Sequence, residues 1–239
     1  MVRVHQTAAD GQRSPSSRTL LEVGRFGTVS RIPVIDRDER TAWLVERDTR
    51  TARWGLRGFA RRRAAREARV LTCLTDVPGV PKLTGWDGRC LQRSWLEGES
   101  LSAGHPVDRA YFREALRLVR RMHARGVANN DLGRATNWLV TLEGGAALVG
   151  FAHARRPRYR GRRFRALACA DLRDLLEHKR AYCGDALTAR ERKLLLRRPT
   201  WLERLWLRWA RPRVTGLSGR PHHGSIVSNS SVGESPGRK

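Results

Sequence analysis

The residues best suited to chemistry lie in one segment, 122–152, which reads MHARGVANNDLGRATNWLVTLEGGAALVGFA. A polar loop within it carries Asp131, and Asn137 follows where a strand is expected to begin. A carboxylate can accept or orient a hydroxyl proton, and an amide oxygen a turn away can ligate a metal ion, which suits phosphoryl transfer. The alternative is that both side chains serve only as hydrogen-bonding groups of a turn.

This segment resembles the catalytic loop and the metal loop of the protein-kinase-like superfamily. In that pattern a helix ends in Leu-His-x-x-Gly, a catalytic Asp and an Asn follow, and a hairpin leads to Asp-Phe-Gly. Here Met-His at 122–123, Gly126, Asp131, Asn137 and Gly-Phe-Ala at 150–152 take those places. The resemblance implies that Asp131 is the catalytic base, that Asn137 is a ligand of Mg²⁺, and that ATP is the phosphoryl donor.

Residues ahead of this segment extend the resemblance. Gly24-x-x-Gly27 resembles a loop that covers nucleotide phosphates, although paired glycines occur in many turns. Arg47 ends the third expected strand, where such folds place a cation for the phosphates, and Glu67 lies where they place its carboxylate partner. Two alternatives stay open: Arg47 belongs to a solvated strand end, and Glu67 is a surface partner on an Arg-rich helix.

The resemblance covers about residues 20–182 and is closest to short bacterial kinases, namely the RIO-type kinases and the lipopolysaccharide core (Kdo and heptose) kinases. Residues 92–98 (QRSWLEG) resemble the hinge between lobes, and Asp171 lies where a helix supplies a carboxylate that braces the catalytic loop. The fold implied is α+β, a compact two-lobed protein-kinase-like fold. Its β-rich N-lobe with one long helix spans 19–98, and its mainly helical C-lobe spans 99–210.

Several positions depart from the family pattern. The catalytic-loop His and Arg are Asn129 and Asn130, and the phosphate-binding cation is Arg47 rather than Lys. The metal-loop Asp is Gly150, which offers no side-chain oxygen. Loss of a principal magnesium ligand costs on the order of several kcal/mol of transition-state stabilisation unless another group substitutes. If the alignment holds, Gly150→Asp restores that ligand and tightens the binding of ATP with magnesium.

Composition points to anionic partners. Lys and Arg total 48 against 23 Asp and Glu, so the formal net charge is +25. This charge excludes an acidic surface and favours phosphates, nucleic acid or acidic lipid head groups as partners. We expect a cytoplasmic protein, with peripheral contact at the inner membrane left open, because no apolar run reaches the ~18 residues of a span and the N-terminal residues lack a signal-like apolar region. The cysteines show no C-x-x-C spacing, which disfavours zinc.

Hydrophobic periodicity predicts the elements that must position these residues. Strands are expected within 20–35 (two, around Gly24 and Gly27), 41–47, 82–85 and 89–96, with a hairpin within 138–151. Helices are expected at 56–74, 110–124, 170–182, after 188 and at 200–210. Residues 1–18 are expected to form a disordered arm and 211–239 a disordered basic tail.

Two further segments have competing interpretations. Residues 155–165 (RRPRYRGRRFR) hold seven Arg in eleven positions and suit an electropositive dock for an anionic acceptor; the alternative is a solvated, disordered loop. The apolar stripe Trp201, Leu202, Leu205, Trp206 and Trp209 belongs either to a helix packed on the C-lobe or to one lying on a membrane surface.

Three functions are compatible with these observations. The first is an ATP- and Mg²⁺-dependent kinase, of serine/threonine type or like the RIO and lipopolysaccharide kinases, that moves the γ-phosphate to a hydroxyl of a protein or an anionic sugar or lipid and is impaired by Gly150. The second is a pseudokinase regulatory module. The third is a basic protein that binds anionic membrane or, less favoured, nucleic acid, which would leave Asp131 and Asn137 unexplained.

Overall fold

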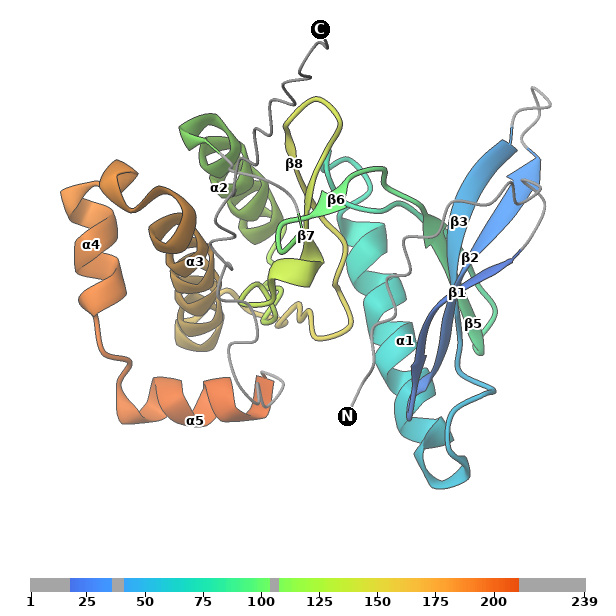
Figure 1. The fold of residues 1–239 in the computed structure, drawn as a ribbon. Helices are drawn as coiled ribbons and strands as arrows, with labels where there is room; N and C mark the ends of the chain where they lie inside the picture. Colours follow the sequence, from blue (N-terminus) through green and yellow to red (C-terminus); the bar gives the residue numbers. More distant parts are fainter. Residues whose placement is uncertain (1–17, 36–40, 104–107, 211–239) are drawn as a thin grey trace, which may run out of the picture.

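The computed structural model describes residues 18–35, 41–103 and 108–210, which form an α+β structure as expected (Figure 1). Its larger sheet is antiparallel, in the order β1-β2-β3-β5-β4. The strands are β1 (Thr19–Gly24), β2 (Gly27–Ile35), β3 (Thr41–Asp48), β4 (Leu83–Trp86) and β5 (Cys90–Ser94). All five lie where the alternation of apolar residues predicted strands.

One long helix connects this sheet to the rest of the chain. After a 3₁₀ turn at Trp54–Leu56, α1 (Arg57–Cys73) lies beside the sheet, between it and the remaining helices (Figure 1). Ala64 and Ala68 pack against Leu91 of β5, since their small side chains let helix and sheet approach closely. At its other end, Val70 and Leu71 belong to the core of the helical half. The two ends of α1 therefore anchor it to different parts of the molecule.

The second half of the chain is mainly helical. It contains β6 (Glu99–Ser100), α2 (Arg109–Ala124), a 3₁₀ turn (Ala135–Asn137), β7 (Trp138–Val140), β8 (Ala146–Leu148), α3 (Arg162–Cys183), a second 3₁₀ turn (Gly184–Ala186), α4 (Ala189–Leu196) and α5 (Trp201–Ala210). Strands β6, β7 and β8 form a small sheet. The core of this second half holds Tyr111, Met122, Trp138 and Phe151, all at most 2 % exposed. The loop with Asp131 packs on this core.

The structure differs from the sequence prediction at α3 and at β6. The predicted helix 170–182 begins at Arg162, so the basic stretch 155–165 runs into the first turn of α3. Phe164 and Leu167 are buried against Ala128, which extends the apolar face of the helix to earlier positions than predicted. Strand β6, with only two residues, is too short to produce a recognisable pattern.

Three members of the apolar stripe predicted for α5 are exposed: Trp201 by 67 %, Leu202 by 37 % and Leu205 by 45 %. The helix packs against the cluster of Phe164 and Leu167 through Leu207, which the predicted stripe did not include. No helix among the described residues is long and apolar enough to cross a membrane. The predictions for 1–17 and 211–239 lie outside the described residues.

Candidate functional site

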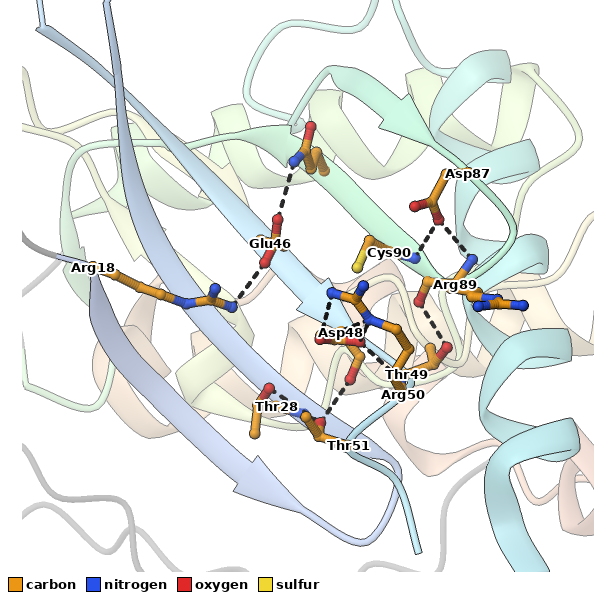
Figure 2. Close-up of polar contacts among 11 residues, drawn as sticks. Arg18, Thr28, Glu46, Asp48, Thr49, Arg50, Thr51, Asp87, Arg89 and Cys90 are labelled. Carbon is orange, nitrogen blue, oxygen red and sulfur yellow. Dashed lines mark hydrogen bonds and ion pairs between the residues drawn. The ribbon is translucent and has the colours of Figure 1, made fainter. Parts of the chain in front are cut away.

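The turn between β1 and β2 and the end of β3 are bound to each other. Gly27 has φ of +114°, and a Cβ there would overlap the carbonyl oxygen of Asp48, so the position requires glycine. Figure 2 shows the polar contacts that hold this end of the sheet: the Thr28 N–H donates to Thr51 Oγ1 at 2.9 Å, and the Thr51 hydroxyl donates to the Asp48 carbonyl. Arg50 donates to the Asp48 carboxylate and lowers its pKa. These contacts fix the end of β3, where Arg47 is paired in the sheet with Val29 and Leu91.

Arg47 lies against Glu67 of α1, as the sequence predicted. Its Nε is 3.4 Å from Glu67 Oε2, and Arg93 of β5 approaches the other carboxylate oxygen at 3.9 Å. Glu67 is 1 % exposed, so it is not a surface residue. A buried carboxylate is retained in a fold only when cations or donors compensate its charge, and here two guanidinium groups do so. The contribution of Arg93 was not predicted because it depends on strand register, in which Arg93 pairs with Val45.

The turn that contains Gly24 and Gly27 lies over the same helix. Phe26 at its tip contacts Phe59 of α1, with ring centroids 5.5 Å apart. The Arg63 guanidinium lies 5.2 Å from the Phe26 centroid. The predicted phosphate-covering turn is thus close to a cation on α1, and neither Phe26 nor Arg63 was selected from the sequence.

A carboxylate of α3 holds the loop that contains Asp131. Asp171, which is fully buried, accepts hydrogen bonds from the backbone N–H groups of Asn129 (2.7 Å) and Asn130 (2.8 Å). His123 Nε2 lies 3.1 Å from the same carboxylate. Asn130 adopts the left-handed backbone region, with φ of 65°. Asp171 therefore occupies the bracing position that the sequence predicted for it, and it fixes the turn that presents Asp131.

Asn137 and Gly150 meet beside Asp131. The Asn137 Nδ2 group donates to the Asp131 backbone carbonyl at 2.8 Å, and Asn129 Nδ2 donates to the Gly150 carbonyl at 2.7 Å. A Cβ built on Gly150 would overlap the amide carbon and oxygen of Asn137 and lie 2.6 Å from its Nδ2. The structure thus brings together three positions that the sequence assigned to one site. The amide of Asn137 occupies the space that a side chain at position 150 would need.

The carboxylate of Asp131 is paired with an arginine. Asp131 is 8 % exposed, and its Oδ1 lies 3.2 Å from Nε of Arg134. The Arg134 side chain is 49 % exposed, so solvent reaches one partner of this ion pair. The sequence shows that Arg134 follows Asp131 by three residues, but this spacing alone does not select Arg134 among the many arginines of the chain.

Two arginines of α1 bind the backbone just after Phe151. Arg63 Nε and an Arg66 terminal nitrogen both donate to the Ala152 carbonyl, at 3.2 and 3.1 Å. A terminal nitrogen of Arg63 lies 2.5 Å from Nε2 of His153. Burial lowers the pKa of His153 to about 3, assisted by Arg63, and burial together with Arg47 lowers the pKa of Arg63 to about 10. His153, which the sequence left without a role, is therefore a neutral acceptor for Arg63.

The donor set does not fit the magnesium ion that the resemblance implies. Among the described residues, no group of three or more His, Cys, Asp and Glu side chains could hold a metal ion. Glu67 and Asp131 each pair with arginine, and Gly150 supplies no carboxylate. Asn137 as a magnesium ligand stays a prediction: its amide nitrogen donates to the Asp131 carbonyl, which leaves its amide oxygen for a metal ion, but one amide oxygen is a weak site for Mg²⁺ without a carboxylate beside it.

The comparison with known proteins gave no match, either to a protein-family model or to a curated protein. The functional interpretation therefore depends on the contacts of the site itself.

Proposed function

We propose that the chain is a kinase-like phosphotransferase that uses ATP and modifies a hydroxyl group of a protein or an anionic sugar or lipid. One observation carries the proposal: the resemblance predicted both the Arg47–Glu67 ion pair and a loop braced by Asp171, and both sets of contacts are present. A cation held by a buried carboxylate suits the binding of nucleotide phosphates, and a rigid loop suits the positioning of a carboxylate at the acceptor hydroxyl.

The chemistry proposed for these residues is a single displacement. The acceptor hydroxyl oxygen forms a bond to the γ-phosphorus while the bond from that phosphorus to the ADP oxygen breaks. The hydroxyl proton passes to the carboxylate of Asp131, which must first separate from Arg134. Arg47 stabilises the phosphate oxygens as their charge redistributes.

A second candidate, the pseudokinase, has a specific observation in its favour. Gly150 lacks the carboxylate of the metal loop, and the Asn137 amide occupies the space that such a side chain would need. A protein of this kind would bind nucleotide at the same residues without turning it over. Binding and turnover must therefore be measured separately.

The test is ATP turnover by the purified chain, measured as ADP formed with and without magnesium, beside ATP affinity from calorimetry. The kinase proposal expects turnover that falls by about a hundredfold or more in Asp131→Asn, the usual contribution of a positioned general base. The matched control is Asp76→Asn, because the Asp76 side chain is 70 % exposed and pairs only with a surface arginine among its described contacts. ATP affinity without turnover in the parent chain would support the pseudokinase, and absence of ATP affinity would contradict both.

A further inference from the structure

We propose that this site binds the polyphosphate of a nucleotide without a divalent cation, the positive charge being supplied by Arg63 together with Arg47 and Arg134. The inference rests on the proposed nucleotide site and specifies how that site neutralises phosphate charge. The occupant is a free nucleoside triphosphate rather than its magnesium complex.

The balance of charge is the first argument. Arg47 and Arg93 pair with the carboxylate of Glu67, and Arg134 pairs with that of Asp131. Arg63 adds a fourth positive charge near these two carboxylates. The site therefore has an excess of positive charge before any ligand enters. A divalent cation would add to that excess and be repelled, whereas a polyphosphate would be attracted.

The neighbouring carboxylate of Asp171 does not reverse this balance. Both of its oxygens are used by the loop N–H groups and by His123, on the buried side of the loop. A metal ion at the site would thus have to compete with arginines for Glu67 or Asp131. A phosphate group needs no such competition, because arginine N–H groups are donors in the geometry that phosphate oxygens accept.

The position of Arg63 is the second argument. Its contacts with the Ala152 carbonyl and His153 hold the side chain next to the backbone that follows Gly150 and Phe151. Its guanidinium is close enough to Arg47, Glu67 and Asp131 for each to affect its pKa. Arg63 is therefore held two residues beyond Gly150, the position where the chain lacks a metal-binding side chain, and near the charges of Glu67 and Asp131.

The third argument is the effect of the surroundings of Arg63 on its pKa. Burial and the nearby charges of Arg47 and Arg66 lower the pKa of Arg63 to about 10, so the charged form is disfavoured in the ligand-free site. An anion placed among these groups would offset that penalty, because it attracts all of the arginines at once. Arg134 is half-exposed, so at least one of these cations is in contact with solvent.

The experiment measures ATP affinity by calorimetry in buffer of about 150 mM salt, where the Debye length of about 8 Å screens diffuse attraction to a highly basic protein. One arm contains EDTA and the other excess MgCl₂. We expect affinity in EDTA to exceed that with magnesium by about tenfold, since magnesium removes two of the negative charges that the arginines would contact. Binding that requires magnesium would overturn the inference and leave the proposed function standing. Absence of ATP binding in both arms would overturn the proposed function as well.

Arginine variants locate the binding. Arg63→Gln is expected to lower ATP affinity in EDTA by about tenfold, the effect of losing one charge-assisted contact. The matched control, Arg62→Gln, changes the same charge on the exposed face of the same helix and should leave affinity unchanged. Equal losses in the two variants would mean diffuse attraction and would overturn the inference. If Arg63→Gln melts at a much lower temperature than the parent, the half-exposed Arg134→Gln carries the same test, again expected to lose affinity relative to the control.

Discussion

His153 makes the stability of this region depend on pH in a predictable direction. Its pKa is about 3 in the folded chain, against an ordinary value of 6.5, because burial and Arg63 disfavour the charged imidazole. Between these values the unfolded chain binds a proton that the folded chain does not, so the free energy of unfolding falls as pH falls below 6.5. Above that pH the contribution is fully present.

The variant His153→Gln should weaken this dependence, because glutamine can still accept from Arg63 but does not titrate. The measurement is the melting temperature of parent and variant between about pH 5 and 7, above the range where most carboxylates titrate. We expect the parent to lose more stability than the variant over that interval. Parallel curves would show that His153 titrates normally.

Gly150 and Asn137 form the second residue-scale prediction. A side chain at 150 must displace the Asn137 amide and break its bond to the Asp131 carbonyl, so Gly150→Ala should cost about 1–3 kcal/mol, the usual cost of overpacking. The Gly150→Asp change carries the same steric cost. The expectation from the sequence, that this change restores a magnesium ligand, did not include the displacement of Asn137.

A double-mutant cycle measures this crowding. Asn137→Gly removes the overlapping amide, and Gly150→Ala should cost clearly less in that background than in the parent. Denaturant unfolding of the four chains gives the coupling free energy. Equal costs in both backgrounds would mean that the two positions do not touch.

At the scale of elements, the clearest prediction concerns how α3 holds the Asp131 loop. Asp171→Ala leaves two buried N–H groups without an acceptor and should destabilise the chain by about 3–5 kcal/mol. The control is Glu177→Gln on the same helix, whose half-exposed side chain pairs with Arg180, a contact worth at most about 0.5 kcal/mol. Urea unfolding compares the two. A small effect of Asp171→Ala would show that the loop is held by other contacts.

The elements were predictable to different degrees, for physical reasons. Amphipathic helices such as α2 and alternating strands such as β3 carry their period in the sequence, and their bounds agree closely with the prediction. The start of α3 was missed because arginines fill three of the four positions of its first turn, while burial of Phe164 decides its structure.

The candidate site was predictable only where a motif carried it. Asp131, Asn137, Arg47 and Glu67 could be selected by their places in a pattern, and the structure brings the members of each pair together. Arg63, Arg93 and Arg134 could not be selected in this way, because the sequence contains many other arginines. Only the tertiary structure distinguishes them, through the register of β5 against β3 and through the contact of α1 with the segment after Phe151.

At the scale of the whole molecule, α1 packs both against the sheet and into the core of the helical half. Val70 and Leu71 of α1 lie in the same cluster as Met122, Trp138 and Leu148 of the second half. The two lobes expected at 19–98 and 99–210 are thus joined by packing across their boundary. Arginines from both halves consequently come to lie close to one another, which bears on the partners of the chain.

Positive charges of α1 and of the stretch 155–165 come together in the fold. Burial, together with the nearby charge of Arg155, lowers the pKa of Arg66 in α1, and burial together with Arg163 lowers the pKa of Arg155. These arginines come from segments that are far apart in the sequence, and the fold brings their positive charges close together. Such a surface attracts polyanions by releasing their counterions, so its affinity should fall steeply with salt.

The last prediction tests this surface with a single-stranded RNA oligonucleotide as the polyanion. A variant with Arg158, Arg162 and Arg163 changed to Gln removes three exposed charges from it, and the matched control changes Arg113, Arg117 and Arg120 to Gln on the exposed side of α2. Each phosphate contact contributes about 0.7 to the slope of log affinity against log salt for a single strand, so the first variant should lose about 2 from that slope. The control should lose much less, although its net charge falls equally. Equal losses would show that the RNA responds to total charge alone, and an unchanged slope in both would show that it binds elsewhere.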